Sequence, residues 1–168
     1  MTTKYTRVAL PLAGLAASIA LLSGAAVAIG PADHTGPPDL WGPPLEALCD
    51  DPALAAAAGY NVIEDPHPDE NGHFGGVLEG TNGADAIYAH GGNDTVYAGR
   101  GNDVVCGSFG NDVLHGEGDN DALFGQGHAN TLRGGNNSDY MEGGDQYDEC
   151  DGGNGDDVAG PGCDTVAE

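Results

Sequence analysis

The chain reads GTNGADAIY over residues 80–88, AHGGNDTVY over 89–97 and AGRGNDVVC over 98–106. Nine such nine-residue units follow one another without insertion. The sixth position carries an acid or its amide, in the order Asp85, Asp94, Asp103, Asp112, Asp121, Asn130, Asp139, Asp148 and Asp157. The eighth position is apolar, in the order Ile87, Val96, Val105, Leu114, Leu123, Leu132, Met141, Cys150 and Ala159. Chance does not keep an acid and an apolar residue in phase over nine periods, so this repeat determines the fold.

Glycine is the other regular feature of the unit. The first position is Gly except at Ala89 and Ala98, and the fourth is Gly except at Asp119, His128, Asn137 and Gln146. We expect Gly at positions one and four to permit positive φ in a tight turn. The three residues after the turn would form a short strand whose middle residue points inward. That eighth-position column would be nearly the whole core, and its burial would barely offset the entropy of the chain.

Both ends of the repeat are irregular. Residues 71–79 look like a degenerate first unit, because Leu78 is in phase and Gly76 stands where an Asp is expected. In the tail, the triplet Asp164-Thr165-Val166 repeats the acid-x-apolar pattern two residues early. Terminal repeats of this kind act as caps.

These residues resemble the RTX nonapeptide family, the hemolysin-type calcium-binding repeats, whose unit is written G-G-x-G-x-D-x-U-x. The resemblance covers residues 80–159, and tandem copies make it specific. It implies an all-β fold, a right-handed parallel β-roll (a β-solenoid) in which two units form one coil. It also implies Ca²⁺ as the cofactor, with several ions bound at the turns.

In such a roll, units two apart stack, and the sixth-position residues form a column at each edge. One column would hold Asp85, Asp103, Asp121, Asp139 and Asp157, and the other Asp94, Asp112, Asn130 and Asp148. Neighbouring strands lie about 4.8 Å apart. Like charges about 4 Å apart repel by roughly 4 kcal/mol at an effective dielectric constant of about 20. Without a cation, the columns should therefore drive the roll apart.

We expect consecutive members of each column to share Ca²⁺ ions. The ion takes about six to eight oxygens, so turn carbonyls would complete the set, among them those of Gly83, Gly92, Gly101 and Gly110. The pairs Asp85/Asp103 and Asp94/Asp112 should be strongest, because their turns keep Gly at position four. The two pairs that share the uncharged Asn130 should be weakest. Mg²⁺ is disfavoured by its stricter geometry. The alternative is that the Asp side chains only form Asx turns with the backbone.

Composition narrows the possible partners. The chain has 168 residues with 30 Gly, 27 acidic and 4 basic residues, and a formal net charge of −23. Nucleic acid is excluded as a partner, because phosphate binding needs Lys and Arg. The length allows one small domain. We expect a monomer whose partners are calcium ions, with any cell-surface or extracellular ligand unknown.

The N-terminal region predicts secretion. Lys4 and Arg7 precede an uncharged apolar run that ends in Ala26-Val27-Ala28, the pattern of a signal peptide cleaved after Ala28. The alternative is a retained membrane anchor; after cleavage the chain would have no membrane span. Residues 29–70 would form a Pro-rich linker with one short helix near 52–58, and residues 71–168 the roll. Asp51 would cap that helix, Pro52 would start it and Gly59 would end it.

Four cysteines in a secreted chain suggest two disulfides, for which three connectivities exist. Cys150 and Cys163 could staple the last coil to the tail, and Cys49 and Cys106 would then tie the linker helix to the roll. The alternative is that Cys150 is a buried free thiol. Zinc is not expected, since the spacings do not match a zinc site.

The sequence carries no motif of a zinc protease, an α/β-hydrolase or a P-loop enzyme, and we expect no catalytic residues. Two other hypotheses are an extracellular adhesion or ligand-binding module built on the calcium-stabilised roll, and a cryptic hydrolase. A module for a repetitive ligand would need a regular face. The seventh positions read Ala86, Thr95, Val104, Val113, Ala122, Thr131, Tyr140, Glu149 and Val158, which is irregular.

Overall fold

The computed structural model describes residues 19–20, 26–27, 42–65 and 75–167. Strands β1 (Ile19–Ala20) and β2 (Ala26–Val27) pair with each other in antiparallel fashion. Apart from these strands, the predicted signal peptide and the proline-rich residues up to 41 lie outside the described residues, as do residues 66–74.

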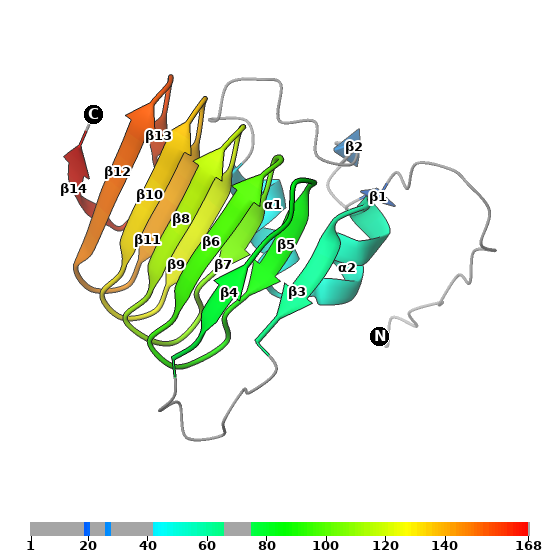
Figure 1. The fold of residues 1–168 in the computed structure, drawn as a ribbon, viewed down its shortest axis with the longest axis horizontal. Helices are drawn as coiled ribbons and strands as arrows, with labels where there is room; N and C mark the ends of the chain where they lie inside the picture. The colour runs from blue at the N-terminus through cyan, green and yellow to red at the C-terminus, as the bar shows by residue number, and fades with distance from the viewer. Residues whose placement is uncertain (1–18, 21–25, 28–41, 66–74, 168) are drawn as a thin grey trace, which may run out of the picture.

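Two parallel six-stranded sheets make up the body of the protein (Figure 1). The sheet that we call the open sheet has the order β14-β12-β10-β8-β6-β4. Its strands are β4 (Val77–Glu79), β6 (Thr95–Arg100), β8 (Val113–Gly118), β10 (Thr131–Asn136), β12 (Asp148–Asn154) and β14 (Cys163–Ala167). The covered sheet has the order β13-β11-β9-β7-β5-β3. Its strands are β3 (Asn61–Glu64), β5 (Asp85–Tyr88), β7 (Val104–Cys106), β9 (Ala122–Gln126), β11 (Tyr140–Gly144) and β13 (Val158–Ala159).

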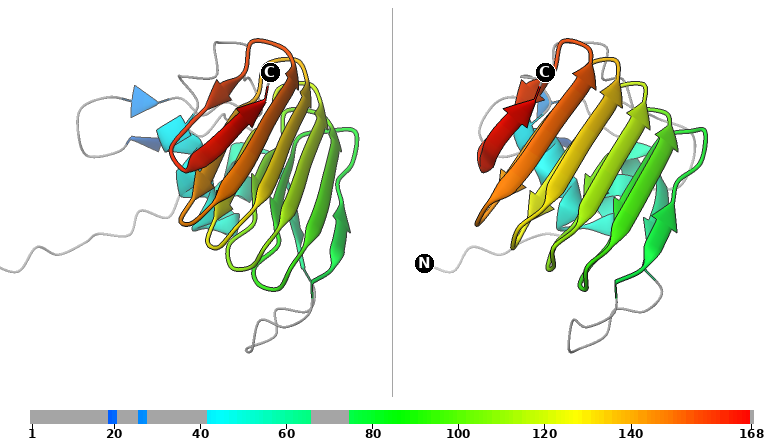
Figure 2. Two further views of the ribbon diagram at one scale, coloured as in Figure 1. Left: turned by 90° about the vertical axis from the view of Figure 1, so that its left-hand side faces the viewer. Right: turned by 60° about the vertical axis from the view of Figure 1, so that its left-hand side comes forward.

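Successive strands alternate between the two sheets, so the chain winds as a β-roll in which each coil contains two nonapeptide units. The register confirms this period, because Val96 pairs with Leu114 and Leu114 with Leu132 in the open sheet. Figure 2 shows the two sheets face to face, with turns along both edges. The predicted fold class is therefore confirmed.

The eighth-position residues fill the space between the sheets, as predicted. All from Leu78 to Cys150 are buried, and they form one cluster with Ala89 and Ala98. Ile63 and Cys163 pack against this cluster from the two ends. The inward column of the repeat is thus the core of the roll.

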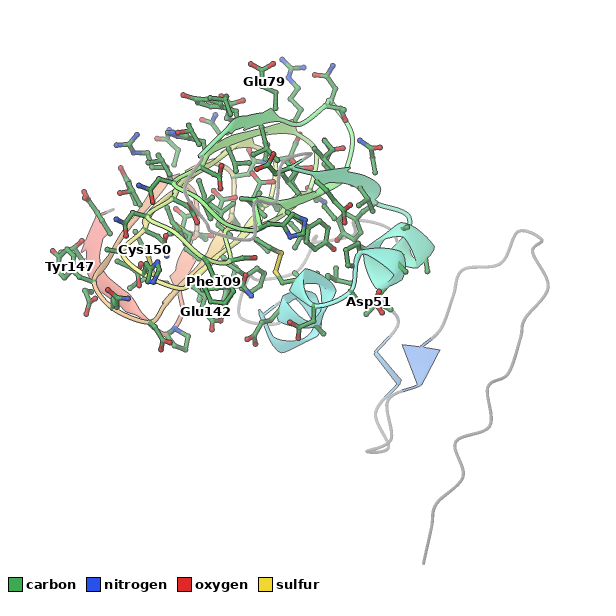
Figure 3. The ribbon with its side chains drawn as sticks, turned by 90° about the horizontal axis from the view of Figure 1, so that it is seen from below. Asp51, Glu79, Phe109, Glu142, Tyr147 and Cys150 are labelled. Carbon is green, nitrogen blue, oxygen red and sulfur yellow. A yellow bond between two sulfur atoms is a disulfide. The ribbon has the colours of Figure 1, made fainter. Side chains whose placement is uncertain are left out.

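A second core, which the sequence analysis did not anticipate, lies on the outer face of the covered sheet. Helices α1 (Gly42–Cys49) and α2 (Pro52–Ala58) pack there (Figure 3). Leu45 and Leu48 of α1 join Tyr88, Phe124 and other outward residues of the covered sheet in one buried cluster. The Tyr88 hydroxyl donates a 2.7 Å hydrogen bond to the carbonyl of Leu48. The expectation that the eighth-position column is nearly the whole core was therefore wrong.

Helix α2 has the predicted bounds and caps. The carboxylate of Asp51 accepts hydrogen bonds from the N–H groups of Ala53 (2.9 Å) and Leu54 (3.2 Å). Gly59 ends the helix with φ of 100°, a conformation that glycine adopts without steric cost. Helix α1 was not predicted, because its Pro43-Pro44 start reads as extended chain although Pro is tolerated in a first helical turn.

Both predicted disulfides are present. Cys49–Cys106 joins the end of α1 to β7, and Cys150–Cys163 joins β12 to the start of β14. Cys150 is thus not a free thiol. The first bond holds the helices against the covered sheet, and the second fixes the irregular last coil.

The first coil includes residues that the sequence analysis placed in the linker. Strand β3 pairs with β5, with Ile63 opposite Ile87. Strand β4 pairs with β6, with Leu78 opposite Val96, as expected for a degenerate first unit. At the other end, the register between β12 and β14 shifts next to Asp148, which accommodates the tail that is two residues out of phase.

Candidate metal centre

The sixth-position residues lie at the turns along the two edges of the roll. At edge one, the turns 80–85, 98–103, 116–121, 134–139 and 152–157 lead from the open to the covered sheet. At edge two, the turns 89–94, 107–112, 125–130 and 143–148 lead back. From Asp85 to Asp148 these residues are at most 3% exposed. A row of carboxyl groups is therefore buried at each edge.

Hydrogen bonds connect each column from coil to coil. From Asp103 onward, the Oδ1 atom of each sixth-position residue accepts a bond of 2.7–2.9 Å from the main-chain N–H of the sixth-position residue one coil earlier. The structure thus brings together all seven pairs expected from the sequence, from Asp85/Asp103 to Asn130/Asp148. Edge two has one more member, since Asp164 Oδ2 accepts a 3.1 Å bond from the N–H of Asp148. The acid-x-apolar triplet in the tail was the signal for it.

The second carboxylate oxygen of most of these Asp residues is buried without a hydrogen-bond donor in the described part of the chain. This holds for the Oδ2 atoms of Asp94, Asp103, Asp112, Asp121, Asp139 and Asp148. A buried polar group left unsatisfied costs about 1–3 kcal/mol, and more when it is charged. Asx turns alone would leave these atoms in that state, so each needs a proton or a cation.

The turn around Asn130 shows what surrounds that second position. The Asn130 Nδ2 group donates to the carbonyls of Gly127 (3.2 Å) and His128 (3.4 Å). Its Oδ1 accepts from Asp112 N–H, which fixes the orientation of the amide. An Asp at the same position directs an oxygen at carbonyl oxygens, an arrangement that a cation satisfies.

The turn 80–85 is satisfied in another way. The N–H and hydroxyl of Thr81 donate to Asp85 Oδ2 at 2.6 and 2.9 Å, and Asn61 Nδ2 donates to Asp85 Oδ1 at 2.6 Å. Both oxygens of the Asp85 carboxylate, the first in the column of edge one, therefore accept hydrogen bonds from protein groups.

Glycine at position one leaves room beside these oxygens. A Cβ built on Gly116 would lie within 3.0 Å of both Asp121 Oδ2 and the carbonyl oxygen of Gly134. Gly107, Gly134 and Gly143 have the same two kinds of neighbour, each with an oxygen of its own turn's Asp. Only glycine fits, and the reason is close approach rather than positive φ.

The expectation of positive φ at position one was therefore wrong. The left-handed residues lie at positions two and four, for example Glu117 (φ 75°) and Asp119 (φ 76°). Position four has a positive φ in most units. These residues are Gly92, Gly101, Gly110, Asp119, His128, Asn137 and Gln146, whereas Gly83 does not have a positive φ. Position two therefore needs a residue that adopts a positive φ, whereas position one needs a residue without a side chain.

The glycines expected to offer carbonyls face the next coil. The carbonyl oxygen of Gly92 and Asp112 Oδ1 both lie close to the point where a Cβ on Gly110 would be. The carbonyl of Gly83 lies in the same way against Gly101. A carbonyl and a carboxylate from stacked turns thus come close together.

A second ladder, which the sequence analysis missed, runs through position five. Asn93 Oδ1 accepts from Asn111 N–H (2.9 Å), and Asn102 Oδ1 accepts from Asn120 N–H (3.1 Å). These bonds point toward the following coil, whereas the Asp bonds point toward the preceding one. The recurrent Asn before the Asp was the signal for this ladder.

Burial raises the pKa values of seven column carboxyls. Desolvation is the largest cause for Asp121, whose pKa rises to about 9, the N–H of Asp103 acting against it and the charges of Asp103, Asp139 and Asp119 adding to it. The same main cause raises the pKa of Asp103 to about 8, of Asp139 to about 8 and of Asp112 to about 7. The pKa values of Asp94, Asp148 and Asp157 are also raised, mainly by burial. Without a cation, the carboxyl groups of Asp103, Asp121 and Asp139 therefore favour the protonated form at neutral pH.

Within the described residues, no three His, Cys, Asp or Glu side chains converge on one point. An ion at a turn would therefore take its oxygens from two stacked carboxylates and from main-chain carbonyls. This donor set consists of oxygen alone, which suits Ca²⁺ and not zinc.

The family model of the RTX calcium-binding nonapeptide repeat (four copies) matches residues 75–105, 107–127 and 124–159. The chain belongs to the RTX calcium-binding repeat family. In this RTX roll, the sixth position of the repeat supplies the two buried columns of Asp residues. Comparisons with curated proteins and with solved structures gave no match.

The RTX roll also has an exposed face, the outer side of the open sheet. The structure divides the seventh positions between two faces, and helices cover those of the covered sheet. On the open sheet, Val77, Thr95, Val113 and Thr131 are consecutive partners in register. Figure 3 shows Glu79 on this side, away from the helices. The next partner in this row is Glu149, opposite Thr131, so position seven is not regular along the whole open sheet, as the sequence indicated.

No helix among the described residues is long and apolar enough to cross a membrane. The two disulfides are typical of an oxidising compartment such as the cell exterior.

Proposed function

We propose that this chain is a secreted calcium-binding protein whose RTX turns bind several Ca²⁺ ions and complete folding as they bind. The observation that carries the proposal is the set of six buried Oδ2 atoms that have no hydrogen-bond donor among the residues that the structure describes. They belong to an RTX repeat and face a space lined by oxygen atoms. The proposed function is binding rather than catalysis.

The proposed ligands are the carboxylates of the sixth position together with turn carbonyls. A bound Ca²⁺ would supply the positive charge that these oxygens lack. The turns 107–112, 116–121, 134–139 and 143–148 are the strongest candidates, since each combines an unsatisfied Oδ2 with Gly at position one. The turns of Asp94 and Asp103 carry Ala89 and Ala98 instead, whose methyl groups reduce the room.

Two turns are proposed to bind weakly or not at all. Asn130 completes its turn with its own amide. The carboxylate of Asp85 accepts hydrogen bonds from Thr81 and Asn61 at both of its oxygens. The first of these assignments agrees with the ranking expected from the sequence, and the second places Asp85/Asp103 below the interior pairs of edge one.

Secretion is part of the same proposal, supported by the signal-peptide pattern of residues 1–28 and by the two disulfides. We propose that residues 1–28 are removed and that the roll then meets the millimolar calcium outside the cell. The cysteine pairs would form in the same compartment.

The test is a calcium titration of the purified chain, followed by far-UV circular dichroism and by calorimetry, with Mg²⁺ as the control. We expect a cooperative gain of β signal with Ca²⁺ alone, accompanied by binding of more than one ion. An unchanged spectrum with no heat of binding would contradict the proposal.

A further inference from the structure

The last turn of edge two is two residues shorter than the others. In the repeat, successive eighth-position residues are nine residues apart, as Met141 and Cys150 are. In the last coil, Ala159 pairs with Met141 and Val166 pairs with Cys150, so seven residues separate them. The chain therefore returns to the open sheet out of phase with the repeat.

Asp164 is a bulged residue near the start of β14. Cys163 lies opposite Asp148. The next pair joins Thr165 to Glu149, so Asp164 is an extra residue on its strand. A bulge of this kind redirects a side chain. The Asp164 Oδ2 atom accepts a 3.1 Å hydrogen bond from the Asp148 N–H, which is the bond that a sixth-position residue accepts in the regular coils.

The unsatisfied oxygen of Asp148 faces this shortened turn. Asp148 is 0% exposed, and its Oδ2 atom has no donor among the residues that the structure describes. A Cβ on Gly143 would lie 2.7 Å from Asp148 Oδ2 and 2.5 Å from the carbonyl oxygen of Gly162. These two oxygens therefore border the same small space. The tail supplies the carbonyl that the following coil supplies to the regular turns.

Asp164 adds a second carboxylate beside Asp148. Burial is the main cause that raises the pKa of Asp148, hydrogen bonds from Asn130 lower it, and the charge of Asp164 raises it further. Two carboxylates this close repel each other unless a cation lies between them. Asp164 is exposed, so an ion can reach the pair from solvent.

The disulfide Cys150–Cys163 connects the two halves of this arrangement. Cys150 follows Asp148 by two residues, and Cys163 lies between Gly162 and Asp164. Strand β14 is the end strand of the open sheet, next to β12 (Figure 2). A cross-link removes conformations in which the end strand has left its neighbour. It therefore holds the oxygens of the tail against those of the preceding coil.

We propose that Asp148, Asp164 and the Gly162 carbonyl bind one Ca²⁺ at the C-terminal end of edge two, and that the Cys150–Cys163 disulfide controls the affinity of this site. The inference rests on the proposed function, because it assigns a ligand from outside the nonapeptide phase to the same column. It also makes full calcium binding dependent on an oxidised cysteine pair, so a reduced chain would bind this ion weakly.

The first test counts bound Ca²⁺ by calorimetry in variants of the full chain. Asp164→Asn and Asp148→Asn should each bind one ion fewer than the unmodified chain, since Asn130 shows that the column accepts Asn. The variant with both changes should also bind one ion fewer, because the two residues share that ion. Glu149→Gln removes the same charge from the exposed residue next to Asp148 and should bind the full number.

The second test removes the disulfide. Cys150→Ala combined with Cys163→Ala should weaken one Ca²⁺ by about tenfold or more, and adding Asp164→Asn should cost no further ion. Removal of the other disulfide, by Cys49→Ala with Cys106→Ala, is the matched control and should leave every edge-two ion in place.

The outcomes separate this inference from the proposed function. If the unmodified chain binds no Ca²⁺, the proposed function itself fails. If it binds Ca²⁺ and Asp164→Asn binds the same number, Asp164 is not a ligand. A cysteine variant that binds every ion with the parent's affinity would overturn the role of the disulfide.

A further comparison covers the case in which Asp164→Asn does not reach the parent's circular dichroism spectrum in saturating Ca²⁺. Asp148→Asn is then measured alone and in the variant without the Cys150–Cys163 disulfide. Equal numbers of tightly bound ions in the two chains support a single site held by the disulfide, and an additional loss in the second chain overturns it.

Discussion

Turns 116–121 and 125–130 follow each other in the chain and have the same backbone shape. Position two is left-handed in both, at Glu117 (φ 75°) and Gln126 (φ 67°), and so is position four, at Asp119 (φ 76°) and His128 (φ 68°). At position six the two turns differ by a single group, a carboxylate oxygen in place of an amide nitrogen. Asp121 has a buried Oδ2 without a donor in the described chain, whereas Asn130 has an Nδ2 that donates to two carbonyls.

This difference separates turn formation from ion binding. In both turns the Oδ1 atom accepts a bond from the preceding coil, from Asp103 N–H at Asp121 and from Asp112 N–H at Asn130, so either residue can build the roll. Only the turn with Asp at position six leaves a carboxylate oxygen, Asp121 Oδ2, next to carbonyl oxygens without a hydrogen-bond donor among the described residues. The turn of Asp85, where Thr81 donates to the second oxygen, shows that a neighbouring residue can do what the Asn amide does.

The largest expected effect comes from calcium removal combined with a change of pH. The folded-state pKa values of Asp103, Asp112, Asp121 and Asp139 are raised to about 7–9 from 3.8. Between these limits the unfolded chain loses protons that the folded chain keeps, so stability falls as pH rises. In EDTA, the melting temperature should drop by more than about 10 °C between pH 4.5 and pH 8.

Saturating Ca²⁺ should abolish or reverse this trend, because the ion replaces the protons and binds more tightly when the carboxylates are ionised. Thermal unfolding followed by circular dichroism measures both series. A melting temperature in EDTA that rises with pH would contradict the account of the buried columns.

Closing the space beside Asp121 should have the next largest effect. A Cβ in Gly116→Ala would meet Asp121 Oδ2 and the Gly134 carbonyl within 3.0 Å. We expect a loss of about 2–4 kcal/mol in the free energy of unfolding and of one bound Ca²⁺. Gly118→Ala is the matched control, since its nearest neighbour would be 3.8 Å away. Equal losses in both variants would show that position one has no special role.

Relief of backbone strain should have the smallest effect and should not distinguish the two kinds of turn. Glu117→Gly removes a side chain from a left-handed position, which should stabilise the roll by about 1 kcal/mol. The gain should be the same with and without Ca²⁺ in urea unfolding. Glu149→Gly, at an exposed strand position, should instead lose about 0.5–1 kcal/mol. Stabilisation by both variants would mean that general loss of charge is the cause.

The sequence predicted those features that depend on period. The eighth-position core and the stacking of Asp residues two units apart follow from the period, and the caps of α2 follow from residue type. These rules are local or repeat many times, so one chain contains enough copies to establish them. The disulfide pairing was only the favoured one of three connectivities, and the structure decides it.

Features that depend on tertiary contact could not be read in the same way. Helix α1 is stable because Leu45 and Leu48 are buried against the covered sheet, and β3 is a strand because β5 offers it an edge. The shortened last turn breaks the repeat at its end, where the period no longer constrains the chain. The roles of positions one and two were confused, since both favour Gly for different reasons.

The most direct test of the account exchanges the side chains that distinguish the two turns. Calorimetric Ca²⁺ titrations of Asp121→Asn and Asn130→Asp measure the number of ions bound, and thermal unfolding in EDTA measures the stability of each variant. We predict that Asp121→Asn binds fewer ions and is more stable than the parent without calcium, by about 1–3 kcal/mol. We predict that Asn130→Asp binds at least as many ions and is less stable without calcium. If Asp121→Asn retains every ion and loses stability in EDTA, the buried oxygen is not a calcium ligand and the central claim is wrong.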